Sequence, residues 1–402
     1  MNDFTKKNKR IWIISEVFYP EETSTSYIMT KIANHLAQNN DVQVICGSPI
    51  YNKKISYSNY FYLEKSIIVH RIKGLEGNKN SVIFRIYRSL ILSLKITKIL
   101  FFNLKSNDKV IIVTNPPLLI LFISILRIMK YFNYNVIVHD IFPENILSSD
   151  LIRKRNVIYN FIKYIFDRAY SIPDCLIPIG EDMKKVLIKK TRKYKIYQKI
   201  VVIPNWAEID TISPSTIRKY SEKIIIQFAG NLGRVQGYRE LLNIIKNVQN
   251  EKIEFVFRGE GAYKKNIIEF VRKNEIKNVY IYNSYKREEQ NEVLNSCDIA
   301  AISLIDTMYG LGVPSRAYNF MAAGKPLLYI GHPESEIALL IKQHKNGFVF
   351  SFNQKNEIIM FLNNLSVFDV SQLNEMGKIS RRIAENEYSE DKILNKFEKI
   401  LS

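Results

Sequence analysis

Short apolar segments alternate with amphipathic segments along the first half of the chain. Residues 11–15, 42–46, 110–114 and 136–139 are apolar runs, most of which end in polar residues, and each is short enough to be a buried strand. Residues 27–38 show the apolar spacing of a helix, and helical patterns also lie between the later strands. This alternation predicts βαβ units around a parallel sheet.

The same alternation recurs in the second half of the chain. It predicts strands at 224–229, 254–258, 279–282, 299–304 and 327–330, separated by helices of about ten residues, the usual βαβ spacing. Residues 201–214 contain Pro204, Asn205 and Pro214 and are typical of a linker. We therefore predict two doubly wound α/β domains, residues 1–200 and 201–380. Ligands of such sheets bind beyond the carboxyl ends of the strands, so two facing domains would share one cleft.

Composition limits the class of protein and its partners. The 58 Lys and Arg residues exceed the 39 Asp and Glu residues by 19 charges, which favours a partner such as nucleic acid, an anionic membrane or a phosphate-bearing substrate. No motif supports nucleic-acid binding. Cys46, Cys175 and Cys297 lie too far apart to indicate a disulfide scaffold or a zinc site. We also expect a cytoplasmic protein, because no signal peptide is visible and the longest nearly apolar run, 118–126, is half of the ~20 residues that span a bilayer.

Two glycine-bearing segments follow strands of the second predicted domain. Residues 230–237, GNLGRVQG, precede a helix, and such turns let a phosphate approach the backbone, although a plain βα turn is the alternative. Residues 309–324 contain Ser315 as a candidate N-cap and Gly324 as a candidate C-cap of a short helix. Arg316 in its first turn opposes the helix dipole, which favours a role in neutralising a bound pyrophosphate over a plain surface arginine.

Two segments of the first predicted domain also place polar residues after strands. Residues 16–26 contain Ser24 and Thr25 in a loop before a helix, although such residues also cap helices. His139 and Asp140 directly follow a strand, where a base or a carboxylate that orients a hydroxyl would be needed. A structural histidine is the alternative for His139.

Seven segments carry a resemblance that extends over nearly the whole chain. They are FYPEETSTSYIMTKIANHL, VHDIFPENI, IPNWAEID, QFAGNLGRVQGYRELL, FRGEGAYKKNI, GLGVPSRAYNFMAAGKPLL and NEYSEDKILNKFEKIL, in that order. The chain resembles bacterial glycosyltransferases of family 4, in the branch that builds capsule, O-antigen and colanic-acid repeat units, and is similar to N-acetyl-fucosamine transferases. The resemblance implies the GT-B fold, in which two Rossmann-like domains face a central cleft and the C-terminal helix, here within 381–402, crosses back to the first domain.

The resemblance also implies a hexosyltransferase-type reaction with retention of configuration and without an obligatory metal or cofactor. Many family members carry two glutamates eight residues apart, where this chain has Leu311 and Asn319. His139, Asp140 and Arg316 are the residues expected to act in catalysis. The residues expected to bind the donor are Gly230, Asn231, Gly233, Arg234, Gln236, Gly259, Gly312, Pro314, Ser315, Asn319, Ser24 and Thr25.

The resemblance suggests a UDP-sugar donor, with an N-acetylated deoxyhexosamine as the transferred sugar, and an undecaprenyl-diphosphate-linked or similar glycan as acceptor. A UDP-sugar 2-epimerase and a non-catalytic membrane-bound assembly component remain alternatives. Basic residues among the apolar residues of 84–105 (Arg85, Arg88, Lys95, Lys98, Lys105) and of 118–132 (Arg127, Lys130) predict peripheral attachment to the inner face of an anionic membrane. Ordinary domain helices with basic solvent faces are the alternative.

Overall fold

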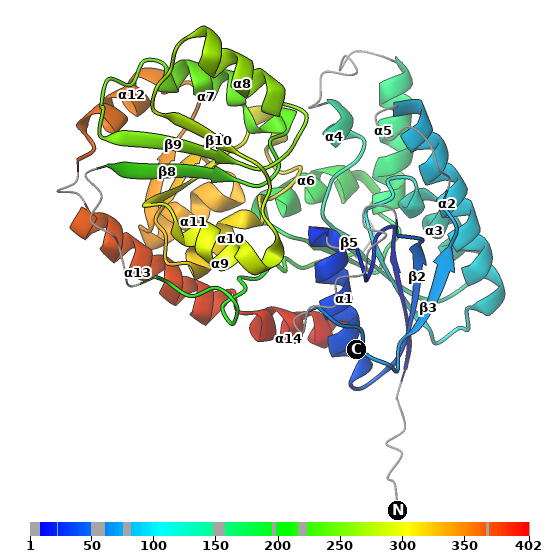
Figure 1. Cartoon of the computed structure of the whole chain (residues 1–402). Helices are drawn as coiled ribbons and strands as arrows, with labels where there is room; N and C mark the ends of the chain where they lie inside the picture. The colour runs from blue at the N-terminus through cyan, green and yellow to red at the C-terminus, as the bar shows by residue number, and fades with distance from the viewer. Residues whose placement is uncertain are drawn as a thin grey trace, which may run out of the picture. The chain divides into compact units, whose positions relative to one another are not determined.

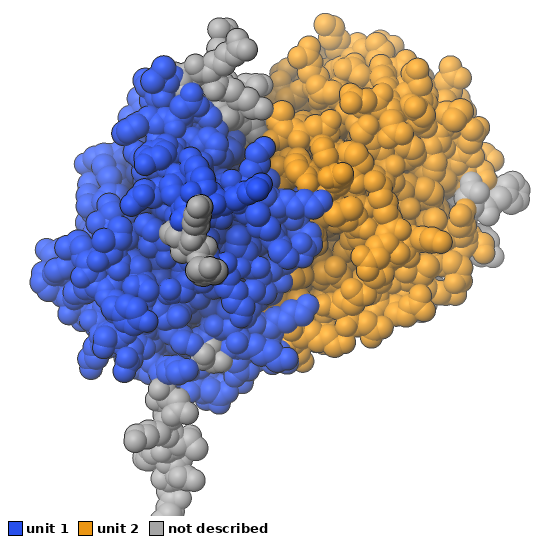
Figure 2. All heavy atoms as spheres, turned by 180° about the vertical axis from the view of Figure 1, so that it is seen from behind, with its two compact units in different colours: residues 1–147, 152–203, 394–402 blue, residues 148–151, 204–393 orange. Residues whose placement is uncertain are grey.

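The chain divides into two compact units. The computed structural model describes residues 9–21, 23–49, 61–74, 82–147, 157–194, 198–215, 223–366 and 370–401. Unit 1 contains the described residues within 1–147, 152–203 and 394–402, whereas unit 2 contains those within 204–393 (Figure 2). The division between Ile203 and Pro204 lies within the segment 201–214, which the sequence marks as a linker.

Unit 1 is built on a fully parallel sheet, part of which is labelled in Figure 1. Its seven strands have the order β3-β2-β1-β4-β5-β6-β7. The order reverses between β1 and β4, so polar residues that follow these strands meet at a topological switch point. The strands are β1 (Arg10–Ser15), β2 (Asp41–Gly47), β3 (Ile68–Ile72), β4 (Lys109–Val113), β5 (Asn133–Val138), β6 (Cys175–Pro178) and β7 (Lys199–Ile200).

Helices connect the strands of unit 1 in the expected rhythm. They are α1 (Ser24–Ala37), α2 (Val82–Asn103), α3 (Leu119–Met129), α4 (Glu144–Leu147), α5 (Val157–Tyr170) and α6 (Glu181–Thr191), followed by the short η1 (Arg192–Tyr194). The hydroxyl of Thr23 accepts a hydrogen bond of 3.2 Å from the backbone N–H of Ser26, which caps α1. Ser24 and Thr25 are therefore the first residues of this helix. The sequence pattern instead places them in the preceding loop, and that prediction is wrong.

Unit 2 has a six-stranded parallel sheet in the order β10-β9-β8-β11-β12-β13. The aromatic rings of Phe228 and Phe257 stack in its core with centroids 4.9 Å apart. Its strands are β8 (Ile224–Ala229), β9 (Ile253–Arg258), β10 (Val279–Tyr282), β11 (Ile299–Ser303), β12 (Leu327–Ile330) and β13 (Gly347–Phe350). Its helices are α7 (Tyr238–Ile245), α8 (Lys264–Lys273), α9 (Gln290–Asn295), α10 (Arg316–Ala322), α11 (Glu336–His344), α12 (Lys355–Asn364) and α13 (Val370–Glu387), with short turns at η2 (Arg234–Gln236), η3 (Arg287–Glu289) and η4 (Asp306–Met308).

The last helix belongs to both units. α14 (Glu390–Leu401) begins in unit 2, and its residues from Leu394 onward group with unit 1, where Glu398 lies 3.2 Å from His35 of α1. The segment 381–402 thus contains the end of α13 as well as α14. Two parallel, doubly wound sheets with a terminal helix that returns to unit 1 confirm the predicted α/β class. In the described part of the chain, no helix is long and apolar enough to cross a membrane.

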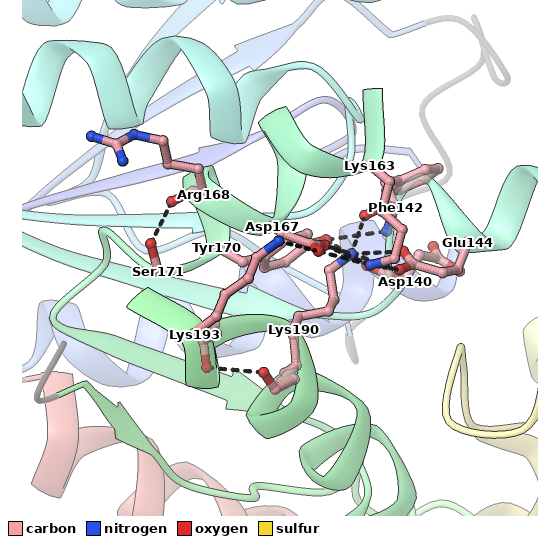
Figure 3. Close-up of polar contacts among 12 residues, drawn as sticks. Asp140, Phe142, Glu144, Lys163, Asp167, Arg168, Tyr170, Ser171, Lys190 and Lys193 are labelled. Atoms are coloured by element: carbon pink, nitrogen blue, oxygen red, sulfur yellow. Dashed lines mark hydrogen bonds and ion pairs between the residues drawn. The ribbon is translucent and has the colours of Figure 1, made fainter. Parts of the chain in front are cut away.

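A buried ionic cluster fixes the segment that follows β5 (Figure 3). Lys190 of α6 is 3% exposed and lies 2.7 Å from both Glu144 of α4 and Asp167 of α5. Its ammonium also donates to the carbonyl of Phe142 at 3.1 Å. Burial lowers the pKa of Lys190, and the attraction of Glu144 and Asp167 opposes this shift. Lys163 contacts the same two carboxylates at 3.0 and 2.8 Å, so the cluster joins three helices to the loop between β5 and α4.

Replacing Lys190 by methionine is expected to lower the free energy of unfolding of unit 1 by about 3–5 kcal/mol, because the change leaves two carboxylates buried beside a single lysine. Urea unfolding checks this in a Trp206→Phe background, in which Trp12 of unit 1 is the remaining tryptophan. Lys193→Met is the matched control, since Lys193 is 55% exposed and 3.9 Å from Asp167, and it should cost less than about 1 kcal/mol. Equal losses in the two variants would contradict a stabilising role of burial in this cluster.

Candidate functional site

Arg316 joins α10 to the turn that follows β8. Its guanidinium donates a hydrogen bond of 2.5 Å to the carbonyl of Ala229, the last residue of β8. A Cβ atom on Gly230 would lie 2.7 Å from the Arg316 Cζ atom, and Gly230 has a φ of +114°, so glycine is required there. Within the described residues, no carboxylate forms an ion pair with Arg316. An arginine held at a strand end without an anionic partner is suited to bind a phosphate.

The other predicted residues of this glycine-rich turn surround Gly230. Gly259, which follows β9, has no room for a side chain, because a Cβ atom there would lie 1.8 Å from the Gly230 carbonyl oxygen. Asn231 and Arg234 are exposed, and Gly233 is buried. The side-chain carbonyl oxygen of Gln236 is buried and accepts no hydrogen bond within the described residues. Gly230, Asn231, Gly233, Arg234, Gln236 and Gly259 thus lie at the carboxyl edge of β8 and β9.

The segment before α10 completes this edge. Gly312, Pro314 and Ser315 are all partly exposed and precede Arg316. Ser315 occupies the N-cap position, but its hydroxyl makes no capping hydrogen bond, so the predicted capping role is not realised. Gly324 follows the C-cap with a φ of +65°, as expected for a helix stop.

A cavity of about 400 Å³ lies in unit 2 at the carboxyl ends of β9 and β10. Arg258, at the end of β9, covers one part of it, with its Cζ atom 4.5 Å from the centre of the Tyr282 ring. No carboxylate pairs with Arg258 within the described residues. The cavity is lined by Arg258, Tyr282, Asn283, Ser284, Tyr285, Glu289, Glu292, Val293 and Ser296. The sequence pattern does not predict this cavity, and its one signal in the sequence is the polar run that follows the strand ending at Tyr282.

Glu208 is a polar residue of unit 2 that the sequence pattern does not single out. It lies in the segment after Pro204 and forms hydrogen bonds with Asn319 of α10 through both its backbone N–H, at 3.2 Å, and its carboxylate, at 3.0 Å. Arg287 donates to the other oxygen of the same carboxylate. Burial raises the pKa of Tyr285, and the nearby charges of Arg316, Glu208, Arg258 and Arg287 act on the same hydroxyl. The side-chain amide of Asn319 is therefore hydrogen-bonded to Glu208, a residue from a distant part of the sequence.

In unit 1, His139 and Asp140 directly follow β5. Their backbone N–H groups both donate to the Thr114 hydroxyl at 3.1 Å, which ties them to the end of the neighbouring strand β4. Burial raises the pKa of Asp140 to about 6, although a hydrogen bond of 2.8 Å from Asn145 partly opposes the shift. Burial lowers the pKa of His139 to about 4, so its imidazole is neutral at pH 7. The buried Nε2 atom of His139 has no hydrogen-bond partner within the described residues.

Tyr170 fixes the backbone at Asp140 and Phe142. Its hydroxyl donates a hydrogen bond to the Asp140 carbonyl and accepts one from the Phe142 N–H, both at 3.3 Å. Through Phe142 and the Lys190 cluster, this tyrosine connects the pair to the core of unit 1 (Figure 3). A neutral imidazole and a carboxyl in this rigid setting can orient hydroxyl groups, and the role expected from the sequence stays a prediction.

Glu16, which follows β1, faces the same edge of unit 1. Its carboxylate pairs with Arg88 of α2 at 2.6 Å, and burial raises the pKa of Glu16 while Arg88 lowers it. The Arg88 side chain is 12% exposed. Its predicted contact with a membrane is therefore wrong, because the guanidinium is used inside unit 1. Ser24 and Thr25 begin α1 on this unit, and the structure does not group them with the Gly230 turn of unit 2. No cluster of metal-binding side chains occurs among the described residues.

Comparisons with known proteins agree with this architecture. Residues 210–378 match the family described as glycosyl transferases group 1. The chain is 28% identical over 400 residues to the probable glycosyltransferase WbjE of Pseudomonas aeruginosa, covering 96% of each protein. It is also similar in structure to sucrose-phosphate synthase from Thermosynechococcus elongatus, with a TM-score of 0.72, 12% identity and 98% of each chain covered. Anabaena HepE in complex with UDP gives a TM-score of 0.66 at 12% identity, covering 98% of this chain and 99% of HepE.

The family match lies on the unit that contains the glycine-rich turn, Arg316 and the cavity, and the full-length relative is a probable glycosyltransferase, not an epimerase. The two parallel sheets and the returning C-terminal helix are the architecture of the GT-B fold. The protein is a glycosyltransferase of the GT-B fold.

Proposed function

We propose that this glycosyltransferase belongs to the family 4 branch of surface-polysaccharide enzymes and transfers a sugar from a UDP-linked donor with retention of configuration. The donor sugar is an N-acetylated deoxyhexosamine, in agreement with the resemblance to N-acetyl-fucosamine transferases. The acceptor is an undecaprenyl-diphosphate-linked or similar glycan. The proposal needs no metal or cofactor, because the cations that it uses are arginines.

The observation that carries the donor assignment is a pair of arginines at one edge of the unit 2 sheet that form no ion pair with a carboxylate in the part of the chain that the structure describes. Arg316 lies against the Gly230 backbone, where only a glycine leaves space, and Arg258 borders the cavity of about 400 Å³. This volume is within the range of small-ligand pockets. A diphosphate near Arg316 with its nucleoside directed toward Arg258 would use both features. HepE, a protein of the same fold, binds UDP.

The proposed reaction places the charge that develops on the leaving group next to Arg316. The acceptor oxygen forms a bond to the anomeric carbon on the face from which UDP departs. The bond between this carbon and the β-phosphate oxygen breaks, and its electron pair stays on UDP. The acceptor proton moves to the same phosphate oxygen. His139 and Asp140 orient sugar hydroxyls, which requires Asp140 in its carboxylate form.

A surface of unit 1 supports attachment to a membrane that carries the acceptor. α3 packs against α2 and α5 (Figure 1). All three helices expose large apolar side chains. Ile83 of α2 is 80% exposed, Ile128 of α3 is 70% exposed and Val157 of α5 is 81% exposed. The exposed apolar residues of this α2–α3–α5 surface are Ile83, Ile86, Tyr87, Leu94, Phe101, Phe102, Ile125, Ile128, Met129, Val157, Ile158, Phe161, Tyr164 and Ile165.

Basic residues accompany these apolar side chains. Arg85, Lys95 and Lys98 of α2 and Lys105 beyond its end are exposed. Each basic residue near an anionic leaflet contributes about 1 kcal/mol to binding. An apolar surface with a basic border matches the interface of an anionic bilayer. We therefore propose peripheral binding of unit 1 to the inner face of the membrane.

Replacing Arg316 by alanine should lower the rate of sugar transfer about a hundredfold, because one charge-stabilising donor next to the leaving group is lost. Arg316→Lys keeps the charge but loses the planar guanidinium that contacts the Ala229 carbonyl, so it should recover part of the rate. Steady-state transfer from a UDP-sugar to a lipid-linked glycan measures both variants, with thermal unfolding as a control for folding. A wild-type rate in Arg316→Ala would disprove the assignment.

The transfer rate at saturating donor should rise about tenfold between pH 5 and pH 7, as Asp140 with a pKa of about 6 becomes a carboxylate. His139 remains neutral over this interval, since its pKa is lowered to about 4. The Asp140→Asn variant should be slower and should lose this rise, while its affinity for UDP stays unchanged. A pH–rate profile that keeps the same rise in Asp140→Asn would show that another group titrates.

Sedimentation with liposomes tests the α2–α3–α5 surface. The protein should bind vesicles that contain acidic lipids, and added salt should weaken the binding. The triple variant Arg85→Gln, Lys95→Gln, Lys98→Gln should bind less. The matched control removes three exposed lysines of unit 2, Lys246, Lys273 and Lys277, and should bind like the wild type. Failure to sediment with acidic vesicles at low salt would refute membrane attachment.

A further inference from the structure

We infer that Glu208 supplies the carboxylate that accepts hydrogen bonds from the vicinal hydroxyl groups of the donor's ribose. This inference rests on the proposed nucleotide donor. It assigns a role to a residue that lies outside the glycine-rich turns and more than a hundred positions away from its partner Asn319.

Glu208 is held rigidly by unit 2. Its backbone N–H donates to the Asn319 side-chain carbonyl oxygen at 3.2 Å, and its Oε1 atom accepts from the Asn319 amide at 3.0 Å. Arg381 of α13 donates to the Ile212 carbonyl at 2.6 Å and to the Ala322 carbonyl at 2.8 Å, which joins the segment after Glu208 to the end of α10. The carboxylate is therefore presented in one fixed position, which lowers the cost of ordering it when a ligand binds.

The carboxylate keeps acceptor capacity for a ligand. Within the described residues, its Oε1 atom accepts one hydrogen bond from Asn319 and its Oε2 atom accepts one from Arg287. An ionised carboxylate has about four acceptor sites, so about two remain. The side chain is 11% exposed, so it is largely buried and still accessible to a ligand. Two hydroxyl donors on adjacent carbons match this remaining capacity, whereas a phosphate would be repelled.

The position of Glu208 favours the ribose over other hydroxyl-bearing groups. Its partner Arg287 begins η3, whose residue Glu289 lines the cavity proposed for the nucleoside. Its other partner, Asn319, lies on the same helix α10 as Arg316, which contacts the turn proposed for the diphosphate. Glu208 is thus connected through its two partners to both parts of the proposed nucleotide site, and the ribose is the part of a nucleotide that connects base and diphosphate.

Asn319 gains a role from the same arrangement. An amide at this position cannot carry a negative charge, but it can hold a carboxylate with its N–H group and a backbone N–H with its carbonyl oxygen, and it does both. The negative charge at this place in the fold therefore comes from the segment after Pro204 and not from α10.

Binding of UDP and of its 2′-deoxy and 3′-deoxy analogues, measured by calorimetry on the full chain, tests the inference. We expect the wild type to bind each deoxy analogue about tenfold or more weakly than UDP, as for a lost hydrogen bond to a charged group. Glu208→Gln should bind UDP about tenfold more weakly and should no longer discriminate against the deoxy analogues. The variant Arg287→Met leaves the carboxylate and its bond to Asn319 in place and is expected to keep the discrimination.

A transfer of the carboxylate provides the sharpest control. In the double variant Glu208→Gln, Asn319→Glu the charge moves to α10, and the discrimination against deoxy analogues should return at least in part. Equal discrimination by the wild type and Glu208→Gln would overturn the inference while leaving UDP binding intact. An effect of Glu208→Gln on a UDP-sugar but not on UDP would place the contact on the transferred sugar and would also overturn it. Absence of UDP binding to the wild type would instead refute the proposed donor.

Discussion

The hydrogen bond from Arg316 to the Ala229 carbonyl is the contact around which unit 2 arranges the polar edge of its sheet. It requires that α10 start next to the end of β8 and that position 230 have no side chain, because the guanidinium fills that space. The same guanidinium lies near Tyr238 at the start of α7, which adds the adjacent helix to the arrangement. A cation that is fixed by a backbone carbonyl, and not by a carboxylate, keeps its charge available for an anionic ligand.

Unit 1 holds its polar residues by a different physical means. Among the described residues, no arginine contributes to the pKa shifts of His139 and Asp140, and burial is the main cause of both shifts. The loop that follows them is fixed in place, because Lys190 donates to the Phe142 carbonyl and also pairs with Glu144 and Asp167 inside the unit. The buried Lys190 cluster thus helps to keep His139 and Asp140 buried. In that environment the imidazole of His139 stays neutral and the pKa of the Asp140 carboxyl is raised.

Glu208 brings a carboxylate next to α10 from a distant part of the sequence. α10 contributes an amide at Asn319, and the carboxylate of Glu208, from the segment after Pro204, accepts a hydrogen bond from it. The positive charge of Arg287 compensates this largely buried carboxylate, so it is not an isolated charge. The surface formed by α2, α3 and α5 differs from this arrangement, because large apolar side chains of these helices are exposed there.

The sequence by itself determined the two parallel sheets, since apolar runs such as 224–229 and the glycines after them report local periodicity and turn geometry. It also located His139 and Asp140 at the end of a strand and Arg316 in the first turn of a helix, because the order of residues fixes which side chains follow a strand or begin a helix. Only the tertiary structure could pair Glu208 with Asn319 or assign Arg88 to Glu16, since these contacts join distant segments. The physical reason is that local patterns encode which face of an element is buried, whereas the partner of a charged side chain depends on how the elements pack.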